Sequence, residues 1–233
     1  MALTPQSGDA FFREVDEELR REQIGSFWRR YGRFVAIAVL LGLAAFGGWL
    51  YWQHRQKVAA DAASEQMTQA LMKIGDGQFA AATPSLDKLK AEGNPGYRGA
   101  AALTEAGIAM ERGDTAGAVA AYKAVTADKN APQAFRDLAL VRMTAAQFDT
   151  LPPAQIIEQL KPLAIAGSPW FGSAGEMTAI AYVKMGKPEL AGPLFAAIAK
   201  EEGAPASIRE RAGRLAMTLG VDAAVAKPGP AKE

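Results

Sequence analysis

Hydrophobic and polar positions divide the chain into two parts with different patterns. Residues 34–52 read FVAIAVLLGLAAFGGWLYW, nineteen residues without a charge. A helix of this length, rising about 1.5 Å per residue, spans roughly 28 Å, close to the ~30 Å hydrocarbon core of a bilayer. Beyond Lys57, apolar residues recur at three- and four-residue spacing between short breaks. The pattern therefore predicts one membrane span followed by amphipathic helices.

The predicted span, residues 34–53, is interpreted as a signal anchor that stays attached to the protein. A buried core helix would usually keep a polar edge, which this run lacks. A cleaved signal peptide would have a shorter apolar region and a small-residue cleavage site, whereas this run ends in Trp-Leu-Tyr-Trp-Gln-His. Both remain alternatives. The residues predicted to lie in the membrane include Phe34, Leu41, Gly42, Gly48 and Trp52.

The charges that flank the span predict which way it crosses the membrane. Basic residues are enriched on the cytoplasmic side of bacterial membrane proteins. After the span only Arg55 and Lys57 precede Lys73. We therefore expect a cytoplasmic N-terminus and a C-terminal part on the other side of the membrane, which is the periplasm if the cell is a Gram-negative bacterium. The basic residues before the span are Arg13, Arg20, Arg21, Arg29, Arg30 and Arg33.

Residues 1–33 are expected to form a cytoplasmic juxtamembrane segment with an amphipathic helix that begins near Asp9. Phe12, Val15 and Leu19 follow helical spacing, and acidic residues precede basic ones, which suits the helix dipole. The helix could be solvated, with its arginines meeting lipid headgroups, or it could contact a cytoplasmic or membrane partner through these three residues. Within the span, small residues four positions apart allow self-association or a contact with another membrane helix. These pairs are Ala38 with Gly42 and Ala44 with Gly48.

Two alternating sets of breaks recur along the rest of the chain. One set lies at Gly77, Gly113, Asp149 and Gly186, spaced by 36, 36 and 37 residues. The other lies at Pro95, Pro132, Pro169 and Pro205, spaced by 37, 37 and 36 residues. Two interleaved sets mean two helices per repeat. The predicted helices cover 58–74, 79–92, 97–112, 115–128, 133–148, 154–166, 170–185, 188–202 and 206–219, the last as a cap, and residues 220–233 are expected to be disordered.

Small residues recur where the two helices of a repeat would cross, and here the chain resembles the tetratricopeptide repeat family. A close crossing requires alanine-sized side chains. The small positions are Ala70, Ala106 and Ala179 in the first helix, and Ala82, Ala118 and Ala191 in the second. Larger residues complete the inner side of the second helix, at Leu86, Tyr122 and Phe195 and at Leu89, Val125 and Ile198. The resemblance implies an all-α solenoid of about four helix pairs plus a capping helix, over residues 57–219.

The third repeat departs from this pattern. Leu151-Pro152-Pro153 lengthens its turn, and no small residue aligns in its first helix. None of the first helices carries the family's tryptophan, and the period is about two residues longer than the family's 34.

The whole layout is similar to a narrower bacterial family that includes the ancillary subunit of the SecYEG translocon (YfgM-like proteins). The similarity is carried by FFREVDEELRREQ and WRRYGR directly before the span. It implies association with the protein-export translocon and with periplasmic chaperones or exported clients.

The first helices of such a solenoid line its concave side, where a partner peptide or helix could bind. Packing against the neighbouring repeat is the alternative for each side chain. Trp170 and Phe171, after a Ser-Pro break, are either core residues or an exposed docking patch. The candidate groove residues are Met67, Leu71, Leu103, Met110, Met177, Ile180 and Val183.

Composition narrows the function classes. The net charge is +1 and residues 57–219 carry 17 basic and 17 acidic residues, so no nucleic-acid partner is expected. Cysteine is absent and His54 is the only histidine. No phosphate loop, metal-ligand spacing or nucleophile motif occurs, so we expect neither an enzyme nor a cofactor.

We therefore expect a membrane-tethered interaction scaffold. An organiser of an envelope or cell-division complex, or a regulator of a cytoplasmic response system acting through the N-terminal segment, is the alternative.

Overall fold

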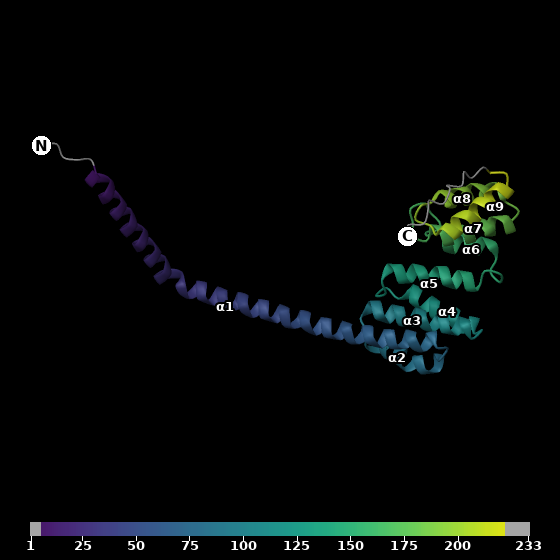
Figure 1. Cartoon of the computed structure of the whole chain (residues 1–233), viewed down its shortest axis with the longest axis horizontal. Helices are drawn as coiled ribbons and strands as arrows, with labels where there is room; N and C mark the ends of the chain where they lie inside the picture. The colour runs from purple at the N-terminus through teal and green to yellow at the C-terminus, as the bar shows by residue number, and fades with distance from the viewer. Residues whose placement is uncertain (1–5, 222–233) are drawn as a thin grey trace. The chain divides into compact units, whose positions relative to one another are not determined.

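The computed structural model describes residues 6–221, with side chains from Arg30 onward. Within this range all regular structure is α-helical, in nine helices. The chain divides into two compact units, residues 1–59 and residues 60–233. Figure 1 shows the helices in chain order. The predicted all-α fold is confirmed.

The first unit consists of most of helix α1, Gln6–Gly75. From Arg30 onward this is the one described helix long and apolar enough to cross a membrane by length and composition. Its apolar side chains are exposed rather than packed: Leu41 is 65% and Trp52 61% exposed. The guanidinium of Arg33 lies 4.9 Å from the ring centroid of Phe34, where the apolar run begins. The buried-core alternative for this helix is therefore wrong.

The structure joins three segments that the sequence predicts as separate helices. α1 runs without a break from the N-terminal segment through the candidate span and on to Gly75, the first helix of the first repeat. Between the candidate span and the repeat the reason is local, because residues 53–57 contain no glycine or proline that would interrupt the helix. Phe12, Val15 and Leu19 belong to α1, but their side chains lie outside the described residues.

The second unit begins with the last turns of α1 and continues through eight further helices. Their bounds lie within two residues of the predicted ones, except that α6 ends six residues early. Pro162 follows the last helical hydrogen bond, which the amide of Lys161 donates to Ile157 O, and proline has no N–H to continue the series. The helices are α2 (Phe79–Glu92), α3 (Pro95–Glu111), α4 (Thr115–Ala127), α5 (Gln133–Ala146), α6 (Pro153–Leu160), α7 (Phe171–Lys184), α8 (Pro188–Lys200) and α9 (Ala206–Thr218).

The turns inside the first, second and fourth repeats share one geometry. Gly77, Gly113 and Gly186 have φ of +73°, +78° and +70°, a conformation that favours glycine. The amide after each glycine donates back to a carbonyl five residues earlier, as from Asp114 N to Ala109 O at 2.9 Å. This is the Schellman arrangement that ends a helix and reverses the chain within three residues.

Alanine contacts hold the two helices of a repeat together. The six predicted crossing alanines all have no exposed surface, and the larger residues that follow them are at most 4% exposed. Ala70 of α1, for example, packs in one cluster with Ala82, Leu86 and Leu89 of α2. Because alanine lets the two backbones approach, these short helices bury a continuous apolar interface.

The third repeat is built differently. In the other repeats the crossing alanines lie five residues before the end of the first helix and three residues after the start of the second. In the third repeat these positions are occupied by Val141 of α5 and Ile156 of α6. The turn between them is six residues long and, within the described chain, contains no left-handed backbone. Thr144 is fully buried, and its Oγ1 lies 3.1 Å from Oε1 of Gln159. Among consecutive helices from α2 to α9, α5 and α6 have the least extensive contact. Larger side chains at the crossing explain this.

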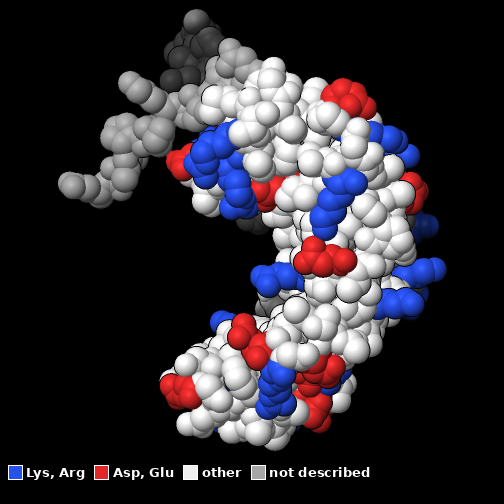
Figure 2. Space-filling model, turned by 90° about the vertical axis from the view of Figure 1, so that its right-hand side faces the viewer, with Lys and Arg blue, Asp and Glu red and all other residues white. Residues whose placement is uncertain are grey.

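The repeats curve, and contacts between helices show which side is concave. We call the repeat portion of α1, with α3, α5 and α7, the first helices, and α2, α4, α6 and α8 the second helices. Successive helices among α3, α5, α7 and α9 contact one another, whereas the second helices of neighbouring repeats, as far as the structure describes them, do not. The first helices therefore lie on the shorter, inner side. Figure 2 shows the hollow of the repeat unit.

Helix α9 occupies the first-helix position of a fifth repeat. It ends in the same left-handed turn, with Gly220 at φ +79° and Val221 N donating to Ala216 O. Val221 then packs where Gly192 of α8 has no Cβ. The outer positions of α9 are mostly polar and exposed, as required of a helix that ends a solenoid.

Candidate protein-interaction surface

The inner side carries a regular row of apolar residues. The penultimate residue of α1, α3, α5, α7 and α9 is apolar in every case, and only the first of the five is half-buried rather than exposed. Because these residues repeat with the helices, their side chains form one row along the inner side, which we call the inner row. It consists of Ile74, Met110, Ala145, Val183 and Met217.

The predicted groove residues separate into two groups. Leu71, Met110 and Val183 are 51%, 36% and 43% exposed and free of the core. The other four are half-buried and pack against the core clusters of their repeats. A role in partner binding stays a prediction for all seven. The half-buried members are Met67, Leu103, Met177 and Ile180.

Met177 does not occupy the groove position that was expected for it. Met67 and Leu103 lie ten residues before the left-handed glycine of their turns, and the equivalent residue in α7 is Glu176. Met177 instead packs with the cluster formed by Ile156 and Leu160. A register counted from the turn glycine would have found this.

The same register identifies residues that the sequence analysis missed. Met217 is 50% exposed and lies three residues before Gly220, as Met110 lies before Gly113. Arg142 and Arg214 are exposed and occupy the position of Leu71 in their helices. Within residues 30–221 neither arginine has a carboxylate partner. The inner side is therefore apolar toward α1 and α3 and gains unpaired positive charge toward α9.

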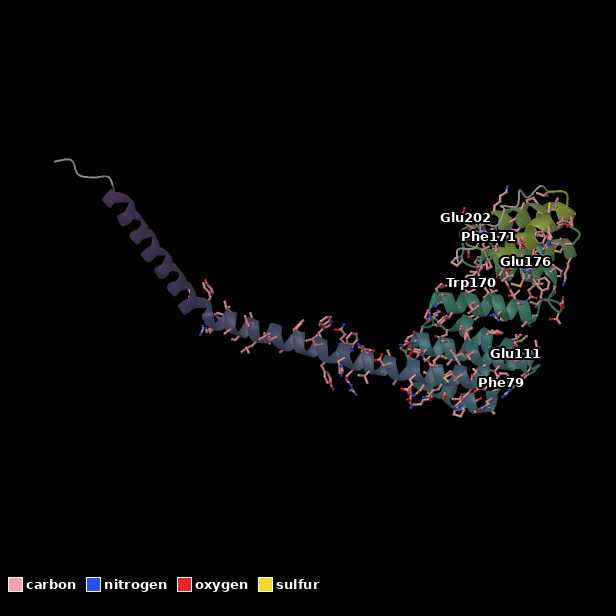
Figure 3. The ribbon with its side chains drawn as sticks, viewed as in Figure 1. Phe79, Glu111, Trp170, Phe171, Glu176 and Glu202 are labelled. Atoms are coloured by element: carbon pink, nitrogen blue, oxygen red, sulfur yellow. The ribbon has the colours of Figure 1, made fainter. Side chains whose placement is uncertain are left out.

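Glu176, labelled in Figure 3, links α7 to α9. It is 9% exposed and accepts two hydrogen bonds from the Arg211 guanidinium, one of them 2.6 Å between Nη2 and Oε2. These bonds raise the pKa of Arg211 above its usual value. A buried carboxylate needs such a partner, so this pair is a link between repeats rather than a free binding group.

Contacts at the turns join neighbouring repeats. The Arg112 guanidinium lies 5.6 Å from the ring centroid of Phe79, one repeat earlier. Lys184 lies over Phe148 at 4.3 Å and pairs with Asp149 at 3.1 Å. Cations over aromatic faces stabilise such contacts modestly, so the turns form a structural edge.

Trp170 and Phe171 belong to the core. Phe171 begins α7, is 2% exposed and packs with Phe195 and Ile198. Trp170 is half-buried against the cluster that includes Ile156. These aromatic residues, labelled in Figure 3, are therefore core residues rather than an exposed docking patch.

The described residues offer no metal-ligand cluster of three or more His, Cys, Asp or Glu side chains. His54 is exposed on α1, just beyond the candidate span. Gly42 and Gly48 have open space around them, so the small-residue face of the span is unobstructed in this chain. Self-association through that face stays a prediction.

Curved pairs of helices with alanine crossings, following a helix that could cross a membrane by length and composition, define an α-solenoid with a candidate membrane anchor. The family of the tetratricopeptide repeat-like domain matches residues 25–210, which is 186 of the 233 residues. The chain belongs to this family.

Two curated relatives are similar to the chain, both named "Ancillary SecYEG translocon subunit". The Haemophilus influenzae protein is 26% identical over 135 residues, covering 58% of this chain and 65% of the relative, just under two thirds of its length. The Escherichia coli protein is 26% identical over 190 residues, covering 79% of this chain and 88% of the relative. No solved structure gives a significant match.

Proposed function

We propose that this protein is a membrane-tethered, non-enzymatic interaction scaffold that associates with the protein-export translocon. In this proposal α1 crosses the bacterial inner membrane as an uncleaved anchor, and the repeat unit lies in the periplasm. There it holds periplasmic chaperones or exported clients near the channel. The proposal extends the printed name of the two relatives to this chain.

The inner row is the observation that carries the proposal. Four of its five residues are exposed although they are apolar. Exposed apolar residues that recur along one side of a curved solenoid suit the apolar side chains of an extended or helical partner segment. Met110 and Met217 are flexible and adapt to different partners. Tethering in the membrane raises the local concentration of this surface, so that weak binding is sufficient.

Co-purification of the full chain in mild detergent tests this function. Met110→Glu and Met217→Glu place a charge on the inner row at exposed positions, where they leave the core intact. We expect each to reduce recovery of translocon subunits, or of periplasmic folding factors, by about tenfold, corresponding to about 1.4 kcal/mol. Ala120→Glu, at an exposed site on α4, is the matched control.

Recovered proteins are identified by mass spectrometry and quantified against the wild-type chain. If the wild-type chain recovers neither class of protein, or if Ala120→Glu reduces recovery as strongly as the two methionine variants, the scaffold proposal is wrong.

A further inference from the structure

A second concave feature lies away from the inner row, between α2 and α4. These second helices do not contact each other in the described structure, because the curvature separates them on the outer side. The gap leaves an open cavity of about 230 Å³ above α3, which we call the outer pocket. Its floor and walls are formed by Gly99, Ala102, Ala124, Val125 and Ala131.

Small residues explain why the cavity is not filled. Ala102 and Ala124 face it with methyl groups where a leucine would close it. Gly99 cannot be larger, since a Cβ there would lie 2.7 Å from Cδ2 of Phe135, whose ring comes from α5 behind the floor. The apolar lining therefore results from the packing of three helices and from the fit of α5 against α3.

Three charged residues form the rim, and one of them, Lys90, is already paired with two carboxylates. Lys90 Nζ lies 2.9 Å from Asp87 and 2.5 Å from Glu105. Asp128 Oδ1 accepts the amide of Asn130 at 2.9 Å. Arg98 is half-buried, yet no carboxylate pairs with its guanidinium in the described part of the chain. Arg98 is therefore the rim cation that no carboxylate of the described chain neutralises, whereas the Asp128 carboxylate on the same rim accepts only an amide hydrogen bond.

Arg136 occupies the equivalent position in α5 and has a structural role there. Arg98 and Arg136 each lie four residues after the N-cap of their helix. The guanidinium of Arg136 donates to the carbonyls of Lys129 and Ala131 and so closes its own loop. Arg98 makes no such bond, so its guanidinium is available at the pocket.

We propose that the outer pocket binds one apolar side chain of a partner polypeptide, and that a carboxylate next to that side chain in the partner pairs with Arg98. The volume is below the roughly 300 Å³ of a typical small-molecule site, which favours a single side chain as the occupant. The unpaired guanidinium matches a carboxylate, with which arginine forms two parallel hydrogen bonds. This contact is independent of the inner row and uses the opposite side of the repeat unit.

Disulfide tethering on the full chain in lipid nanodiscs tests the proposal, since the protein contains no cysteine of its own. Lys129→Cys places a single thiol beside Asp128 at an exposed position. Three amidated peptides, Cys-Gly-Leu-Glu, Cys-Gly-Leu-Lys and Cys-Gly-Ser-Glu, are exchanged against excess 2-mercaptoethanol, and the mixed disulfides are measured by mass spectrometry. We expect the Leu-Glu peptide to exceed each of the others by about fivefold.

Two further variants in the Lys129→Cys background locate the effect. Ala124→Leu fills the pocket from an exposed position and should abolish the preference for Leu-Glu over Ser-Glu. Arg98→Gln removes the charge and should abolish the preference for Leu-Glu over Leu-Lys. Ala120→Leu, one turn earlier on α4 and outside the lining, should retain both preferences, as should Met110→Glu on the inner row.

Equal capture of the Leu-Glu and Ser-Glu peptides would show that no apolar side chain is bound. Equal capture of Leu-Glu and Leu-Lys would remove the role of Arg98. A preference that survives both Ala124→Leu and Arg98→Gln would place the binding elsewhere. Each result would overturn the proposal and leave the inner-row function to its own test.

Discussion

At the scale of single residues, glycine and alanine perform separate tasks in this chain. Gly113 ends a helix in left-handed backbone, at φ +78°, where a side chain would be strained. Gly107 lies inside α3 with open space around the position of a Cβ. Ala118 has no exposed surface and lies at the crossing of α3 and α4. Positions 113 and 118 thus require a small residue, whereas position 107 does not.

Replacing each of the two glycines by alanine should therefore have opposite effects. Gly113→Ala is expected to lower the free energy of unfolding by about 1–2 kcal/mol, the cost of left-handed backbone for an L-residue. Gly107→Ala should raise it by up to about 1 kcal/mol, because alanine restricts the unfolded chain and favours helix. Thermal unfolding of the full chain in detergent, followed by circular dichroism, measures both. Shifts of the same sign would contradict the left-handed turn.

At the scale of the helices, the third repeat is the weakest connection in the solenoid. α6 has eight residues and follows a turn of six, whereas α4 and α8 have thirteen residues each and follow three-residue turns. Val141 and Ile156 replace the alanine pair at the crossing. Less extensive packing means that local opening requires less free energy. The repeats before and after this point are therefore expected to unfold with different stabilities.

Hydrogen exchange should reveal this difference. In the full chain in nanodiscs, amides of α6 should exchange faster than those of α8, which occupies the same place in the next repeat. An accompanying Ile156→Ala variant should accelerate exchange in α6 further, because it removes a fully buried side chain at a cost of about 2–5 kcal/mol. Equal protection of α6 and α8 in the wild-type chain would mean that the longer turn does not weaken the repeat.

At the scale of the whole molecule, the proposed function depends on the side of the membrane that each unit occupies. Six arginines precede the candidate span, and two basic residues follow it before Lys73. This asymmetry favours a cytoplasmic N-terminus. The absence of cysteine makes the topology directly measurable, since any introduced thiol is unique.

Labelling with a membrane-impermeant maleimide in intact cells whose outer membrane has been permeabilised should distinguish the two sides. Ser207→Cys, at an exposed position of α9, is expected to react, whereas Ser26→Cys should react only after the inner membrane is disrupted. The reverse pattern would place the repeat unit in the cytoplasm and exclude contact with periplasmic chaperones.

Local chemistry in the sequence determined the helices, their turns and their pairing. Glycine at a left-handed turn, proline at a helix start and alanine at a crossing each act within a few residues, so their spacing of about 36 residues predicted the repeats. Counting residues from the turn glycines also locates the inner row in the sequence. That count assigns Met217 to the row, and it assigns Glu176 rather than Met177 to the position of Met67.

Only the tertiary structure decided which surfaces form between repeats. The curvature that separates α2 from α4 arises from contacts among first helices far apart in the chain. The outer pocket depends on that separation. The sequence also does not distinguish the free guanidinium of Arg98 from the bonded guanidinium of Arg136. The burial of a side chain and its ion pairs depend on neighbours that the fold brings together. The spacing of residues along the chain does not indicate which neighbours these are.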